Sequence, residues 1–160
     1  IHILINSNGT LIKKEFWKIK KVDEVQFSLD GPRHINDAIR GKGVHNKVME
    51  AIKICKNNKI NATLTTVISK YNTSHIAYVL DIAREYKVGV YFQPVDQNLS
   101  SNSPEDINLL FAPSESDYKK TISYLIDEKK SGRKFINNSL AGLRHLYYWP
   151  SPRLMKCLVG

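Results

Sequence analysis

Short segments rich in β-branched and aromatic residues alternate along the chain with segments whose apolar residues recur at helical spacing. The strand-like segments are residues 1–6, 23–29, 60–68 and 88–95. The helix-like segments are about 12–21, 44–58, 73–87, 115–130 and 136–148. Strands that are separated by single helices lie parallel, so the pattern predicts an α/β fold with a parallel sheet of four strands.

Capping residues and buried stripes support these helix assignments. Asn72 with its two successors provides an N-cap for the helix at 73–87, and Ser114 with Asp117 forms an acidic capping box at the start of 115–130.

Cys55 lies on the apolar stripe of the helix at 44–58, which indicates an inert, buried thiol. Residues 96–113 are rich in Asn, Ser and Pro and are predicted to form a long polar loop.

The second strand has one apolar and one polar side. Val25, Phe27 and Leu29 alternate with Gln26, Ser28 and Asp30. A polar side is unexpected for a strand that helices cover on both faces, so it is predicted to face a ligand cavity. A closed eight-stranded barrel needs about 250 residues, which leaves an open sheet or an incomplete barrel as alternatives.

Polar residues also stand near the carboxyl ends of the other strands. Asn8 follows the first strand, Thr65 and Thr66 lie near the end of the third, and Gln93 lies near the end of the fourth. Ligands of parallel α/β proteins bind at this edge, because the loops that follow the strands converge there. We therefore expect the functional site at the carboxyl ends of the strands.

The segment from Ser28 to Gly41 places a hydroxyl, a carboxylate and a guanidinium on one loop after the second strand. In one interpretation, Arg40 binds a ligand carboxylate and Ser28 or Asp30 holds ribose hydroxyls. In the other, the segment is an ordinary turn, and Arg40 pairs with Asp37 on the surface. Residue propensities alone favour the second interpretation.

Composition excludes several classes of protein. The 160 residues include 24 Lys and Arg, 15 Asp and Glu and two cysteines, with a formal net charge of +9. Two cysteines cannot form a disulfide framework or a four-thiolate metal site. No apolar run reaches the roughly 18 residues of a membrane span, and no sequence pattern of a zinc hydrolase, serine hydrolase or P-loop is present. The chain begins inside a strand-like run, so we expect it to be part of a longer, cytoplasmic protein.

Several motifs, in this order, resemble the radical S-adenosylmethionine (SAM) superfamily. They are Ser-Asn-Gly at 7–9, Ser-Leu-Asp-Gly-Pro at 28–32, Asp-x-x-Arg-Gly at 37–41, Thr-Thr-Val-Ile at 65–68 and Phe-Gln-Pro at 92–94. The resemblance covers nearly the whole chain and is strongest to the branch with a SPASM or twitch extension. It implies that the four strands are the third to sixth of a six-stranded partial (β/α) barrel.

The resemblance also implies roles for individual residues. Ser28 would contact S-adenosylmethionine, Arg40 would pair with its carboxylate, and Asp30 would support the loop or the ribose. The backbone around Phe92 and Gln93 would meet the adenine, and Asn8 is a further candidate cofactor contact. None of these residues is assigned a catalytic role.

The family's organisation predicts three regions: a partial core at 1–113, a helical region at 114–155 and the start of a SPASM or twitch extension at 156–160. Cys157 would be the first ligand of an auxiliary cluster. The CxxxCxxC loop that binds the main 4Fe-4S cluster is absent from the sequence, so this chain alone is expected to be inactive. Asn36 replaces a histidine that is often found in the Arg-Gly loop.

The parent protein is thus expected to be a radical SAM iron–sulfur oxidoreductase. It would cleave S-adenosylmethionine reductively and abstract hydrogen from a peptide, protein or small molecule, with flavodoxin or ferredoxin as reductant. Two alternatives are a non-catalytic α/β module that binds a nucleotide or small molecule, and a basic nucleic-acid-binding domain. The basic residues are scattered among acids and no nucleic-acid motif is present, which makes the last alternative the weakest.

Overall fold

In the computed structural model, which describes residues 1–95 and 110–149, the chain forms one parallel sheet with helices packed against it. The strands lie in chain order: β1 (Leu4–Ser7), β2 (Glu24–Ser28), β3 (Asn61–Ile68) and β4 (Gly89–Pro94). All three pairings are parallel, as the alternation of strands and helices predicts. The α/β prediction is confirmed.

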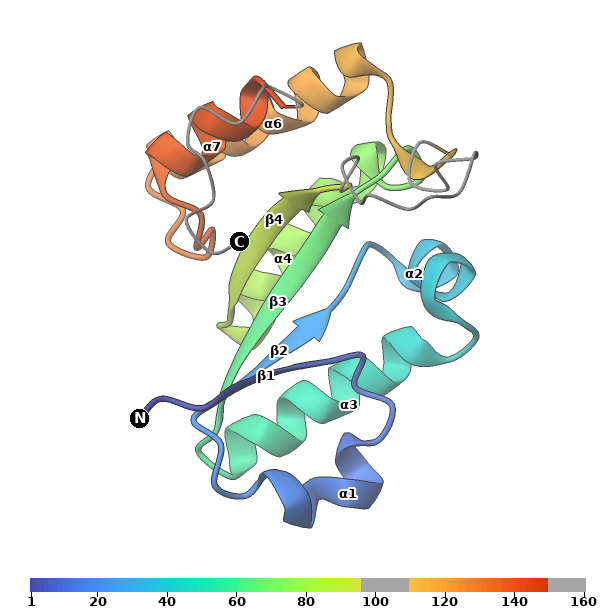
Figure 1. Cartoon of the computed structure of the whole chain (residues 1–160), viewed down its shortest axis with the longest axis vertical. Coiled ribbons are helices and arrows are strands. Elements are labelled where there is room, and N and C mark those ends of the chain that lie inside the picture. Colours follow the sequence, from blue (N-terminus) through green and yellow to red (C-terminus); the bar gives the residue numbers. More distant parts are fainter. Residues whose placement is uncertain (96–109, 150–160) are drawn as a thin grey trace, which may run out of the picture.

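The helices follow the strands at the expected places. They are α1 (Ile12–Ile19), α2 (Arg33–Arg40), α3 (Val44–Asn57), the short 3₁₀ helix η1 (Thr73–His75), α4 (Ile76–Tyr86), α6 (Glu115–Lys130) and α7 (Leu140–Tyr147). Figure 1 shows α3 along β2, α1 on the far side of α3, and the pair α6 and α7 at the β4 side of the sheet. Among the residues that the structure describes, no helix is long and apolar enough to cross a bilayer.

The core lies between the apolar face of the sheet and the helices. Phe27, Leu64 and Phe92 are almost completely buried on three adjacent strands. They meet the apolar stripes of α3 and α4, including Cys55, whose burial raises its pKa to about 11. Cys55 is therefore the inert core thiol that the helical pattern predicts.

The opposite face of the sheet keeps its polar character. Gln26 and Ser28 on β2 and Thr63 and Thr65 on β3 are only half-buried, beside the exposed Tyr91 on β4. This face matches the polar side predicted for the second strand. Helices against one face and polar side chains on the other are features of a partial (β/α) barrel.

Two local predictions are wrong. Arg33–Arg40 forms helix α2 rather than loop, although Pro32 before it and Gly41 after it are typical helix boundaries. The apolar pattern misses α2 because its one buried residue is the polar Asn36. Asn72 does not cap the following helix, since its amide bonds Ser69 N and Val67 O instead.

The last helix is shorter than predicted, because the residues before it pair with the sheet. The helix α7 begins at Leu140, where the Ser139 side chain accepts a hydrogen bond from Gly142 N. Ile136 instead forms an isolated parallel bridge with Val90 of β4. In contrast, the prediction that Ser114 is the N-cap of α6 is confirmed, with a 3.1 Å bond from Asp117 N to Ser114 Oγ. The Asp117 carboxylate accepts a bond from the Ser114 hydroxyl at 2.7 Å, and not the backbone bond of a capping box.

Asn138 covers the free edge of β4. Its Oδ1 accepts a hydrogen bond from Phe92 N at 2.8 Å, and its Nδ2 donates one to Phe92 O at 3.0 Å. One side-chain amide thus satisfies both backbone groups of an edge residue, as a neighbouring strand would. This contact also occupies backbone atoms that the sequence assigned to adenine.

We expect Asn138→Ala to lower the free energy of unfolding by about 1–3 kcal/mol, because it leaves two half-buried backbone groups of Phe92 unpaired. Asn138→Asp keeps the acceptor and loses the donor, so its effect should be smaller at a pH where the carboxylate is charged. Urea unfolding of both variants measures the difference. An Asn138→Ala protein as stable as the wild type would show that this contact does not stabilise the edge.

Candidate functional site

A cavity of about 320 Å³ lies at the carboxyl ends of the strands. Its walls come from all four strand ends, from α2 and from the start of the segment before α6. The lining residues are Asn8, Asp30, Ile39, Arg40, Val67, Ser69, Val95 and Phe111. Three of the predicted cofactor contacts are therefore brought together: Asn8 from the turn after β1, Asp30 from the end of β2 and Arg40 from the end of α2.

Asp30 is the structural centre of this site. Its side chain is 2% exposed and stands directly after β2. Its Oδ2 accepts a bond from Arg40 Nε at 2.5 Å, and its Oδ1 accepts one from Val67 N at 3.0 Å. Its own backbone N–H donates to Asn36 Oδ1 at 3.0 Å. Asp30 thus ties the end of β2 to β3 and to α2, which favours the supporting role over a ribose contact.

Arg40 ends α2 and reaches back to the strand ends. Its side chain is 24% exposed. Among the described residues, its one ion pair joins Nε to the Asp30 carboxylate. Binding through Nε uses one edge of the guanidinium and leaves the N–H donors of the opposite edge, on the two Nη groups, for another acceptor. Arg40 therefore lines the cavity in an orientation that a buried carboxylate fixes.

The surface pair between Arg40 and Asp37 that the turn interpretation predicts does not form. Asp37 instead accepts hydrogen bonds from Gly43 N at 2.8 Å and His45 N at 2.9 Å, at the start of α3. Asp37 also lies 3.9 Å from Arg33 Nε, one turn earlier on α2. The short connection between α2 and α3 explains the difference, since it directs the open N-terminus of α3 toward Asp37.

These hydrogen bonds make Asp37 sensitive to acid. The backbone N–H groups of His45 and then Gly43 hold the pKa of Asp37 below its ordinary value of 3.8. A carboxyl whose pKa is lower in the folded protein stabilises the fold above the unfolded-state pKa, and this contribution is lost as the pH falls through the folded-state pKa. We expect Asp37→Ala to reduce stability at pH 7 and to matter less at pH 3 in urea unfolding. An equal loss at both pH values would contradict this assignment.

The β3 end of the cavity is shaped by a second hydrogen-bonded turn. Asn72 is fully buried, accepts a bond from Ser69 N at 2.8 Å and donates one to Val67 O at 2.8 Å. Thr66 Oγ1 donates to Leu29 O at 2.6 Å, which fastens the ends of β2 and β3 together. Val67 and Asn72 belong to the motifs that resemble the radical SAM superfamily, but neither was predicted as a ligand contact. Their contacts depend on how the two strands pair.

The close approach of the turn after β1 to α3 requires a glycine. Gly9 has a φ of +76°, and a Cβ at this position would lie 3.1 Å from Val48 Cα. Asn8, just before it, accepts bonds from Thr10 N at 3.1 Å and Thr10 Oγ1 at 2.7 Å. This turn holds Asn8 at the rim of the cavity.

The other predicted contacts lie outside this cavity lining. Ser28 is half-buried at the end of β2, Phe92 is buried in the core, and the exposed Gln93 lies on the polar side of β4. Both polar backbone groups of Phe92 are bonded to Asn138. Cys157 lies outside the described residues, as does most of the loop predicted at 96–113.

The described residues do not provide a cluster-binding site. Residues 1–95 and 110–149 contain no group of three or more His, Cys, Asp or Glu that could hold a metal ion. Cys55 in that part of the chain is buried in the core, away from the strand ends. The residues that the structure describes therefore do not fit an iron–sulfur cluster.

The fold and the site together define a parallel α/β chain of the partial-barrel type with a polar cavity at its strand ends. In sequence, the chain is 30% identical over 159 residues to an uncharacterized protein of Archaeoglobus fulgidus, covering 96% of this chain and 37% of the relative. It is 37% identical over 78 residues to a cysteine-type anaerobic sulfatase-maturating enzyme of Clostridium novyi, covering 45% of this chain and 21% of that enzyme. No protein-family model matches the sequence.

Solved structures have the same fold. A native anSMEcpe structure with bound AdoMet and Kp18Cys peptide has a TM-score of 0.64 and 20% identity, over 85% of this chain and 40% of that one. SuiB of Streptococcus suis bound to S-adenosylmethionine has a TM-score of 0.59 and 17% identity, over 82% of this chain and 29% of that one. The chain resembles a part of the core of the radical SAM superfamily, as its motifs indicate. It spans about two fifths or less of the length of these relatives.

Proposed function

We propose that this chain forms part of a radical SAM enzyme and supplies one wall of its S-adenosylmethionine site. The observation that carries the proposal is the Asp30–Arg40 pair at the strand-end cavity, with its Nε–Oδ2 distance of 2.5 Å. A guanidinium held by a buried carboxylate is well suited to bind a second carboxylate through its Nη groups. The carboxylate of S-adenosylmethionine has this chemistry.

The remaining contacts are proposed from the resemblance and from the strand-end positions of the residues. Asn8 at the rim offers its amide to the ligand, and Ser28 at the end of β2 contacts the methionine or ribose portion. Gln93 and the strand end around it contribute to the adenine side, with Phe92 acting through its packing because Asn138 holds its backbone. Asp30 acts as a positioning residue for Arg40.

The iron–sulfur chemistry is proposed for the whole protein. A 4Fe-4S cluster, for which the described residues provide no site, would supply the electron for reductive cleavage of S-adenosylmethionine to methionine and a 5′-deoxyadenosyl radical. That radical would abstract hydrogen from a peptide, protein or small molecule, and flavodoxin or ferredoxin would provide the electron in the cytoplasm. The anSMEcpe structure with a bound peptide supports a peptide substrate. Cys157 would begin the ligand set of an auxiliary cluster in a SPASM or twitch extension.

The deciding experiment uses the full-length protein, purified and reconstituted without oxygen. We expect about four irons or more per chain and release of 5′-deoxyadenosine that depends on dithionite. Asp81→Ala serves as a control variant, because it removes an exposed carboxylate of α4 that does not line the cavity. Its iron content and its release of 5′-deoxyadenosine should equal those of the wild type.

Two other outcomes would count against a radical SAM enzyme. Binding of S-adenosylmethionine without iron or cleavage would favour the non-catalytic small-molecule module. Absence of iron, cleavage and S-adenosylmethionine binding would contradict the proposal altogether.

A further inference from the structure

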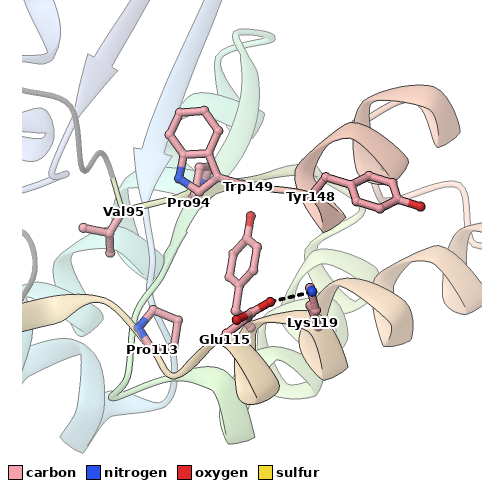
Figure 2. A pocket seen from close by; sticks show the side chains of 8 residues that line it. Pro94, Val95, Pro113, Glu115, Lys119, Tyr148 and Trp149 are labelled. Atoms are coloured by element: carbon pink, nitrogen blue, oxygen red, sulfur yellow. Dashed lines mark hydrogen bonds and ion pairs between the residues drawn. The ribbon is translucent and has the colours of Figure 1, made fainter. Parts of the chain in front are cut away.

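A second cavity lies at the other side of the β4 end, next to α6 and the residues that follow α7. Its volume is about 320 Å³. Pro94 and Val95 form one wall, and Pro113 and Tyr118 contribute from the segment before α6 and from α6 itself. Figure 2 shows the Trp149 indole across the cavity from Glu115 and Pro113. Of the residues that line this cavity, only Pro94 belongs to a motif that indicates S-adenosylmethionine binding.

Two side chains of this cavity, the buried Tyr118 and the half-buried Trp149, each have a buried polar atom without a partner among the described residues. Tyr118 is 5% exposed, and its hydroxyl has no hydrogen-bond partner among the described residues. The same holds for Trp149 Nε1 within the part of the chain that the structure describes. Buried tyrosine hydroxyls and tryptophan N–H groups normally find a partner, because leaving them unpaired costs the energy of removing them from water. Two such atoms lining one cavity indicate a missing acceptor.

The protonation state of Tyr118 is fixed by its surroundings. Burial raises the pKa of Tyr118 well above its ordinary value of 10.0. The hydroxyl therefore remains protonated at any physiological pH and can donate a hydrogen bond. Trp149 Nε1 is a donor only, so each of the two atoms can donate to an acceptor oxygen.

The charges around the cavity are already paired with each other. Lys119 Nζ lies 2.6 Å from Glu115 Oε1, and this ion pair lies at the exposed rim. Lys119 also stands over the ring of Tyr147, 5.7 Å from its centroid. The ion pair satisfies the lysine, so the cavity offers neutral donors inside and apolar walls of proline and valine around them.

We propose that this cavity binds a small ligand with a carbonyl or carboxylate oxygen on a flat apolar body, the oxygen accepting hydrogen bonds from Tyr118 and Trp149. The flat body would lie among Pro94, Val95 and Pro113. The cavity borders the strand-end cavity at Val95, which lines both. A ligand here would lie beside the proposed S-adenosylmethionine site, but its binding does not depend on that assignment.

The test measures the affinity of three small aromatic probes for the full-length protein by ligand-observed NMR. Benzamide offers a neutral carbonyl, benzoate offers a carboxylate, and toluene offers neither. We expect benzamide or benzoate to bind more tightly than toluene, and the better of the two identifies the natural group as carbonyl or carboxylate.

The variant Tyr118→Phe isolates the hydrogen bond. It should weaken binding of the better acceptor probe about fivefold and leave toluene unchanged. Trp149→Phe should act in the same direction. Tyr118→Phe keeps the ring and removes a buried unpaired hydroxyl, so it should fold with unchanged or higher stability. Tyr124→Phe, at an exposed tyrosine of α6 outside the cavity, is the matched control.

Three outcomes would overturn the proposal. One is equal affinity of all three probes for the wild type. Another is an affinity for benzamide and benzoate that Tyr118→Phe leaves unchanged. The last is displacement of the bound probe by S-adenosylmethionine, which would make the cavity part of the strand-end site.

Discussion

Asp30→Ala is expected to lower the free energy of unfolding by about 3–5 kcal/mol, the range for breaking a buried ion pair by removing one partner. The substitution leaves Arg40 Nε and Val67 N without their acceptor. It also removes the side chain that joins β2, β3 and α2 at one point. Urea unfolding monitored by circular dichroism measures this loss.

The control for this prediction is another carboxylate paired with an arginine. Asp81 pairs with Arg84 on α4, but both side chains are more than half exposed. Because solvent screens such a pair, Asp81→Ala should change the stability by no more than about 1 kcal/mol. Equal effects of Asp30→Ala and Asp81→Ala would show that the buried pair does not hold the strand ends together.

Arg40→Lys is expected to weaken S-adenosylmethionine binding about 10- to 100-fold, the cost of losing a hydrogen bond to a charged group. Lysine keeps the charge, but a single ammonium cannot bond Asp30 and also present a planar pair of donors to a ligand carboxylate. The measurement is the dissociation constant by isothermal titration calorimetry in the full-length protein.

Arg33→Lys provides the matched control, because Arg33 lies on the same helix with a side chain that is 67% exposed. Its affinity for S-adenosylmethionine should equal that of the wild type. If Arg40→Lys also binds with unchanged affinity, then Arg40 does not contact the cofactor carboxylate. The guanidinium would then have a structural role only, as the partner of Asp30.

The two predictions separate positioning from binding. Asp30→Asn keeps the acceptor for Val67 N but removes the charge that holds Arg40. If Asp30 acts through Arg40, Asp30→Asn should weaken S-adenosylmethionine binding, and combining it with Arg40→Lys should add little further loss. Independent, additive losses would indicate that Asp30 also contacts the ligand directly.

Local periodicity determined most of the fold. The four strand-like segments became β1 to β4, and the apolar stripes of α3 and α4 pack against the sheet as the spacing predicts. The polar side of β2 identified Ser28 and Asp30 before any contact was known, because alternation along a strand fixes which side chains share a face. The same reasoning could not find α2, whose one buried residue is an asparagine.

The partners of the site residues were decided by tertiary structure. From the sequence, Arg40 could pair either with Asp37, three residues away, or with a ligand. In the structure, Arg40 pairs with Asp30, and Asp37 accepts hydrogen bonds from backbone N–H groups at the start of α3. Likewise, Asn138 meets Phe92 across 46 residues. Spacing along one element fixes the direction of a side chain, but contacts between elements depend on how strands register and where helices end. The sequence alone therefore determined the elements and the edge at which the site lies, and only the packed structure decided which atoms meet there.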